Sequence, residues 1–79
     1  MTKSRSKRQC NFWANVAVYY IGPLGRDIHS FSRRDFNLAS VKSHCLETVV
    51  GHYAMAGLKV QQFAIVYDGG VEVFEVANG

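Results

Sequence analysis

Residues 11–21 read NFWANVAVYYI, and this stretch decides the fold. It has the character of a β-strand, in which successive side chains point to opposite faces of a sheet. One face takes Phe12, Ala14, Val16, Val18 and Tyr20, and the other takes Trp13, Asn15, Ala17, Tyr19 and Ile21. Because both rows are largely apolar, the stretch predicts a sheet whose second face also needs a cover or a use.

The following segment predicts a second strand. Gly22, Pro23 and Gly25 interrupt the apolar pattern, as turn residues do. A strand rich in polar residues is expected over 27–36, in which Ile28, Ser30 and Ser32 alternate with His29, Phe31 and Arg33. The serines and arginines of this segment favour a position at the edge of the sheet or a solvent-facing side.

One amphipathic helix is predicted over 40–56. Its apolar stripe recurs at every fourth residue and consists of Val41, Cys45, Val49 and Tyr53. Asn37 or Ser40 is the expected N-cap. Gly57 stands where a left-handed residue commonly ends a helix. The stripe indicates that the helix covers one face of the sheet.

The C-terminal part predicts a β-hairpin. Strands over 58–67 and 71–76 flank Asp68-Gly69-Gly70, and Asp-Gly between apolar runs is a strong hairpin signal. The register pairs Val66 with Val71 and Ala64 with Val73. We expect the helix to cover Val60, Ala64, Val66, Val71 and Val73. The opposite face then receives Phe63, Ile65, Tyr67 and Phe74.

These elements predict an α+β fold of order ββαββ, with one amphipathic helix packed on one face of an antiparallel four-stranded sheet. A chain of 79 residues supports one small domain, expected over 10–79 after a basic flexible tail over 1–9. No apolar run has the length of a bilayer span, so no membrane is expected. Two cysteines make no disulfide framework, which favours a cytoplasmic location.

The net charge of +3 is unevenly distributed along the chain. Lys3, Arg5, Lys7 and Arg8 crowd the tail, and no acidic residue precedes Asp27. Such an arm binds nucleic acid or an acidic surface in one interpretation. In the other it is a solvated start that keeps a small protein soluble.

Catalytic and metal chemistry find little support in the sequence. His44 and Cys45 are adjacent, so on a helix they point about 100° apart, and no CxxC or HxxxH spacing occurs. His52 falls inside the apolar stripe, where a hydrogen-bonded core histidine is expected. The acidic residues are scattered over separate elements. We therefore predict no enzymatic activity, no metal and no cofactor.

The sheet face opposite the helix is the predicted binding surface, because aromatic residues and arginine are enriched at interfaces. The predicted contact residues are Trp13, Tyr19, Phe31, Arg33, Arg34, Phe63 and Tyr67. A protein partner, a second copy of the chain and nucleic acid all fit such a face. For nucleic acid the site would add Lys3, Arg5, Lys7, Arg8 and Arg26. In the alternative interpretation, strand curvature, loops and the tail cover the face.

Three short segments resemble the small RNA polymerase inhibitors of podoviruses. They are FWANV at 12–16, HSF at 29–31 and YAMAGLKV at 53–60. In that family, similar segments sit on a first strand, a second strand and a helix-to-strand junction. The arginines that the family carries on the strand after its helix have no counterpart at Gln61, Gln62 and Ala64. The size and fold format are also similar to those of small anti-CRISPR proteins of phages.

The resemblance implies a phage-type protein that binds a host nucleic-acid-processing machine in the host cytoplasm and blocks it sterically, without enzymatic activity. An anti-CRISPR protein bound to a CRISPR–Cas effector is the leading prediction. An inhibitor of host RNA polymerase is the second. A small nucleic-acid-binding protein that uses the aromatic sheet face and the basic tail is the third.

Overall fold

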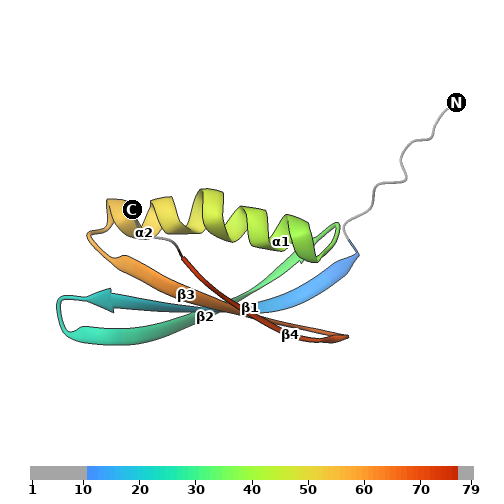
Figure 1. Cartoon of the computed structure of the whole chain (residues 1–79). Coiled ribbons are helices and arrows are strands. Elements are labelled where there is room, and N and C mark those ends of the chain that lie inside the picture. The colour runs from blue at the N-terminus through green and yellow to red at the C-terminus, as the bar shows by residue number, and fades with distance from the viewer. Residues whose placement is uncertain (1–10, 77–79) are drawn as a thin grey trace, which may run out of the picture.

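The computed structural model describes residues 11–76, which form a four-stranded antiparallel sheet with one helical segment packed on it (Figure 1). The predicted tail over 1–9 lies outside the described residues. The elements in chain order are β1 (Phe12–Gly22), β2 (Gly25–Asp35), α1 (Leu38–His44), η1 (Cys45–Val49), α2 (Val50–Met55), β3 (Lys59–Tyr67) and β4 (Gly70–Glu75). The predicted α+β fold of order ββαββ is confirmed.

The strands lie in the order β2-β1-β3-β4, so the apolar stretch over 11–21 becomes the central strand β1. Val16, for example, lies between Phe31 of β2 and Ile65 of β3. In this position β1 is hydrogen-bonded to a neighbouring strand on each side. The polar β2 lies at an edge, as its serines and arginines predict, and β4 forms the other edge.

Two-residue turns close both hairpins. Gly22 pairs with Gly25 across the first turn, and Tyr67 pairs with Gly70 across the second. Gly25 and Gly70 have φ angles of 108° and 149°, which residues with a Cβ atom rarely adopt. The predicted pairing of residues 66 with 71 and 64 with 73 is confirmed.

The helical segment is continuous over α1, η1 and α2. The Asn37 side chain accepts a hydrogen bond from the Ser40 N–H at 2.8 Å, so Asn37 is the N-cap. Gly57 ends the segment with a φ of 81°. A stripe that repeats every four residues drifts by about 40° per step in an α-helix. The π turn of η1 holds more residues per turn and offsets part of this drift, which keeps Cys45 and Val49 on the sheet.

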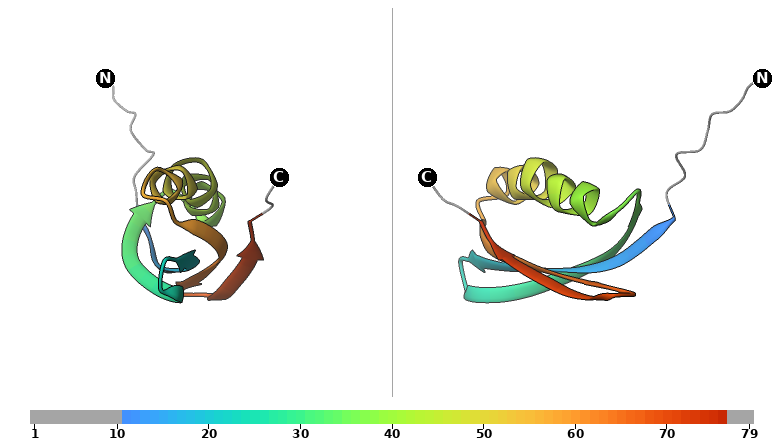
Figure 2. Two further views of the ribbon diagram at one scale, coloured as in Figure 1. Left: turned by 90° about the vertical axis from the view of Figure 1, so that its left-hand side faces the viewer. Right: turned by 45° about the vertical axis from the view of Figure 1, so that its right-hand side comes forward.

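The core lies between the helical segment and one face of the sheet (Figure 2). Its buried apolar residues are Ala14, Val16, Val18, Val41, Cys45, Val49, Val60, Phe63 and Ile65. Aromatic pairs extend this core at both ends. Phe12 contacts Tyr67 with ring centroids 5.5 Å apart, and Tyr20 meets Tyr53 edge-on at 5.1 Å.

A β-bulge in β3 interrupts the in–out alternation of the strand. Tyr19 of β1 pairs with Gln62, but Tyr20 pairs with Val60, so Gln61 has no partner in β1. An extra residue of this kind reverses the facing of every later residue relative to strict alternation. Val60 and Phe63, three residues apart, therefore both face the helix and are buried.

The predicted facing of the C-terminal hairpin is consequently wrong. Strict alternation from Val60 gave the helix side to residues 64 and 66, together with their β4 partners. In the structure the helix side holds Phe63, Ile65, Tyr67 and Phe74, all buried or packed against the core. The opposite side holds Ala64, Val66, Val71 and Val73.

Candidate binding face

The sheet face turned away from the helical segment, which we call the open face, has no covering layer among residues 11–76 (Figure 2). Cross-strand pairing arranges its side chains in rows that run from β2 to β4. The rows are Ile28–Tyr19–Gln62–Glu75, Ser30–Ala17–Ala64–Val73, Ser32–Asn15–Val66–Val71 and, at one end, Arg34–Trp13.

Exposed apolar side chains concentrate on this face. Five of the nine large apolar residues that are exposed in the described chain belong to it: Trp13, Ile28, Val66, Val71 and Val73. They are between 46% and 61% exposed. The valines form one block on β3 and β4, whereas the β2 side carries serines and an asparagine. A contiguous apolar block on a small domain marks a candidate interaction surface.

Trp13 and Arg34 form the end of the open face near the start of β1. The guanidinium carbon of Arg34 lies 5.1 Å from the centroid of the Trp13 ring, which is a cation–π arrangement. The pairing holds the indole ring on the sheet while leaving it 57% exposed. Tryptophan and arginine are the residue types that most often dominate binding energy at interfaces.

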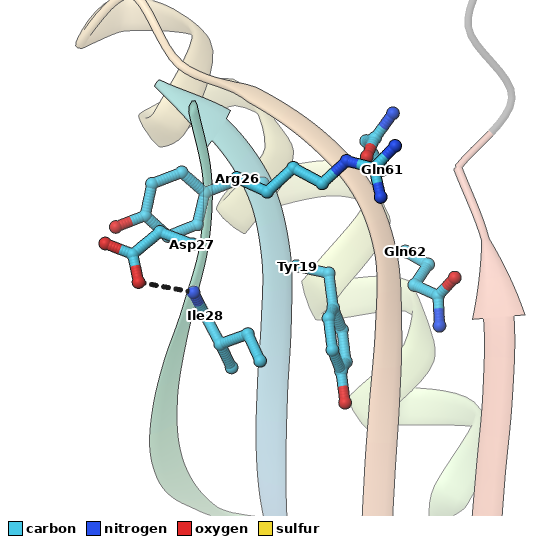
Figure 3. Close-up of a pocket in the computed structure, with 7 residues that line it drawn as sticks. Tyr19, Arg26, Asp27, Ile28, Gln61 and Gln62 are labelled. Carbon is cyan, nitrogen blue, oxygen red and sulfur yellow. Dashed lines mark hydrogen bonds between the residues drawn. The ribbon is translucent and has the colours of Figure 1, made fainter. Parts of the chain in front are cut away.

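A shallow hollow of about 520 Å³ lies at the other end, beside the bulge (Figure 3). Tyr19, Arg26, Ile28, Gln61 and Gln62 contribute to its lining. The Arg26 side chain extends toward Gln61 across the sheet. The guanidinium group and the two amides supply hydrogen-bond donors next to an aromatic ring and an isoleucine. The hollow can therefore receive a polar group at the margin of an apolar contact.

The charges of the open face are mostly positive and lie at its rim. Arg26 and Arg34 lie at opposite ends of β2, and Lys59 of β3 pairs with Ile21 of β1. Glu75 on β4 is the acidic residue that shares these rows. This distribution leaves the centre apolar and the margin charged, which is the usual anatomy of a protein interface.

The seven predicted contact residues divide between the two sheet faces. Trp13, Tyr19 and Arg34 lie on the open face. Phe31 and Tyr67 pack against the core on the helix side, and Phe63 is fully buried.

Arg33 also lies on the helix side, where its Nε donates to the Asp35 carboxylate at 2.9 Å. Placing Arg33, Phe31, Phe63 and Tyr67 on the sheet face opposite the helix is therefore wrong. Of the residues predicted for nucleic acid, Arg26 lies on the open face. The tail residues Lys3, Arg5, Lys7 and Arg8 lie outside the described residues.

Sequence reasoning missed Ile28, the three valines and the two glutamines of the open face. The signal for the valines is the pair Gln61-Gln62 between Val60 and Phe63, because two successive polar residues break the alternation that a regular half-buried strand would show. The fully buried side chains of Phe63 and Ile65 are also larger than those of Ala64 and Val66, and larger side chains gain more from burial.

A buried polar cluster lies on the other side of the sheet, next to the start of the helix. Burial alone would raise the pKa of Asp35, but hydrogen bonds from the Phe36 N–H and from Arg33 bring it below its usual value. Burial, followed by the nearby Arg33 charge, lowers the pKa of His44. The cluster is internally paired, which is typical of a structural role.

The cysteine within residues 11–76, Cys45, is fully buried. Burial raises the pKa of the Cys45 thiol to about 11, so the thiol is protonated at neutral pH and is a poor nucleophile. His52 is exposed, and its predicted place in the core is wrong. Within residues 11–76 no three His, Cys, Asp or Glu side chains converge as a metal site requires.

No helix in the described part of the chain is long and apolar enough to cross a membrane. No protein-family model matches the chain, and no curated protein or solved structure is significantly similar to it.

Proposed function

We propose that this protein is a non-enzymatic inhibitor that docks its open face on a protein of a nucleic-acid-processing machine. The supporting observation is the continuous open face, in which a block of exposed valines adjoins the Trp13–Arg34 pair. Docking buries this apolar surface, and a rigid small domain then blocks the site it occupies.

The distribution of charge favours a protein over nucleic acid as the target of the open face. Five Lys and Arg residues against six Asp and Glu residues lie within 11–76, because four of the nine basic residues belong to the tail. A surface that binds phosphates needs a marked excess of positive charge. The valine block also offers neither stacking nor hydrogen bonding to bases.

RNA polymerase is the first target class that we propose. The three segments that resemble the podovirus inhibitors lie on β1, on β2 and at the junction of α2 with β3. The resemblance implies the same placement in that family. A CRISPR–Cas effector, the leading prediction from the sequence, is the second target class, since it rests on size and fold format alone.

Transcription by a purified bacterial RNA polymerase holoenzyme tests this proposal. We expect the wild-type protein to reduce run-off transcript in a concentration-dependent manner. Val73→Asp places a charge within the valine block of the open face, and burying it unpaired should weaken inhibition about tenfold or more. Leu24→Asp is the matched control, because Leu24 is fully exposed in the first turn and should leave inhibition unchanged.

Parallel assays separate the alternatives. Cleavage of target DNA by purified CRISPR–Cas effectors, with the same two variants, tests the second target class. Fluorescence polarisation with a single-stranded oligonucleotide over a salt series tests nucleic-acid binding. The proposal would be overturned if the wild-type protein inhibited neither transcription nor DNA cleavage. Tight, salt-dependent oligonucleotide binding that Val73→Asp does not weaken would overturn it as well.

A further inference from the structure

The outer edge of β4 presents unpaired backbone groups. Tyr67 and Gly70 flank a two-residue turn, so they form a hydrogen-bonded pair, and every second residue of β4 after Gly70 also bonds toward β3. The Val76 N–H donates to the Gln61 carbonyl at 2.9 Å, in keeping with this pattern. The N–H and C=O groups of Val71, Val73 and Glu75 therefore point away from the sheet, where no described element lies.

The opposite edge, β2, differs from β4 in one outward backbone group and in charge. By the same reasoning, the even-numbered residues of β2 point their backbone groups outward. The Asp27 carboxylate accepts a hydrogen bond from the outward Ile28 N–H at 2.8 Å. A capped N–H is not available to an incoming strand, and the three arginines of β2 outnumber its two aspartates, so this edge disfavours a basic segment. No side-chain cap is observed on the outward N–H groups of β4 within the described chain, so the two edges differ.

The surroundings of the β4 edge are acidic. Asp68 stands in the turn, and Glu72 and Glu75 lie on β4 itself. Glu72 has a contact with Lys42 at 3.4 Å, and both groups are more than a third exposed. A second copy paired edge to edge would bring two such sets of carboxylates together, and nucleic acid would be repelled. A basic extended segment has the complementary charge.

We propose that the β4 edge binds an extended basic segment of a partner protein as an antiparallel fifth strand. Strand addition of this kind draws its affinity from backbone hydrogen bonds and its specificity from alternate side chains. The inference goes beyond the proposed function, because it concerns the sheet edge and needs no inhibitory activity.

The register of β4 specifies the side chains of the added strand. An antiparallel strand places its successive residues opposite Glu75, Phe74, Val73, Glu72 and Val71. Cross-strand pairing then favours the order basic, apolar, apolar, basic, apolar. Its first, third and fifth residues join the open face, where Val71 and Val73 already lie. The basic residues meet Glu75 on the open face and Glu72 on the helix side.

Binding of a fluorescein-labelled peptide of sequence TKFVKVT to the full-length protein tests the proposal. We expect saturable binding, and much weaker binding of the charge-reversed peptide TEFVEVT. Val73→Pro removes one outward N–H without breaking a bond to β3, so it should weaken binding about tenfold. Ser30→Pro is the matched control, because it makes the same change at the outward edge of β2 and should leave binding unchanged.

A second variant keeps the test valid if proline impairs folding, which circular dichroism would detect. The exposed change Glu75→Lys, which leaves the Glu72–Lys42 contact in place, should reduce the preference for TKFVKVT over TEFVEVT. Equal binding of both peptides to the wild type, no binding, or equal weakening by the two proline variants would overturn the proposal. A molecular mass of twice the chain in solution would also overturn it, since a second copy would then be the partner. Peptide binding that appears only after Lys3, Arg5, Lys7 and Arg8 are changed to glutamate would overturn it too, since the basic tail would then be the segment that competes for the edge.

Discussion

The facing of β3 decides which side chains form the open face, and adjacent alanine substitutions test it. Ile65 is fully buried on the helix side, whereas its neighbour Val66 is 46% exposed on the open face. The two residues share a strand and pair with the same two neighbouring strands. Comparing Ile65→Ala with Val66→Ala therefore isolates the effect of facing from that of position in the sheet.

The expected costs follow from the carbon atoms removed and their burial. Ile65→Ala removes three carbons that are fully buried, about 2.4 kcal/mol at about 0.8 kcal/mol each. A cavity adds to this transfer cost, so the free energy of unfolding should fall by about 3–5 kcal/mol. Val66→Ala removes two carbons that are about half exposed, which gives less than about 1 kcal/mol.

Urea unfolding followed by circular dichroism measures both changes. A domain of this size is expected to have a free energy of unfolding of about 4–12 kcal/mol. Val66→Ala should therefore keep a transition near that of the wild type, whereas Ile65→Ala should unfold at much lower urea or already be unfolded in buffer. Similar slopes for the two variants would show that the unfolded states are comparable. If Val66→Ala cost more than Ile65→Ala, strict alternation from Val60 would hold, and the open face would be composed of other residues.

Three further predictions concern the helix and its surroundings. Asn37→Ala should lower the free energy of unfolding by about 1 kcal/mol in the same urea assay, because the Ser40 N–H loses its acceptor. The pKa of Asp35 is lowered in the folded state, so its contribution to stability is present above about pH 4 and is lost as the pH falls through the folded pKa. Asp35→Asn should therefore reduce the difference between urea midpoints at pH 6 and pH 3, whereas an unchanged difference would contradict this role of the carboxylate. In a Cys10→Ser variant, Cys45 should resist iodoacetamide at pH 8 in buffer and react in urea, because burial keeps its thiol protonated; rapid alkylation in buffer would contradict its burial.

The sequence predicts the elements of this fold well because each has a strong local signal. Turn glycines mark both hairpins, the apolar stripe marks the helix, and polar residues mark β2 as an edge strand. The π turn of η1 has no comparable signal. It is consistent with tertiary packing, because a stripe with a spacing of four residues must stay in contact with one face of the sheet over several turns.

The candidate site is less predictable from the sequence, since the extra residue Gln61 decides which side chains of β3 and β4 lie on the open face. Alternation predicts which side chains of a strand share a face, and it was correct along β1. It fails beyond Gln61, because a bulge is local and its effect extends to the end of β3 and across the hairpin into β4. The sequence predicts Trp13 and Tyr19 on the open face but not the valines.

The open face and the β4 edge meet at Val73, and this residue separates the two proposals. Its side chain is 55% exposed on the open face, while its N–H points out of the sheet edge. Val73→Asp retains the N–H but places a charge on the apolar surface. Val73→Pro retains an apolar side chain but removes the donor. If a partner used the face alone, inhibition would respond to aspartate and tolerate proline. If it used only the edge, proline would be the more damaging change. A partner whose strand adds to β4 and continues across the open face would be sensitive to both, because its alternate side chains would extend the same apolar surface to which Val73 belongs.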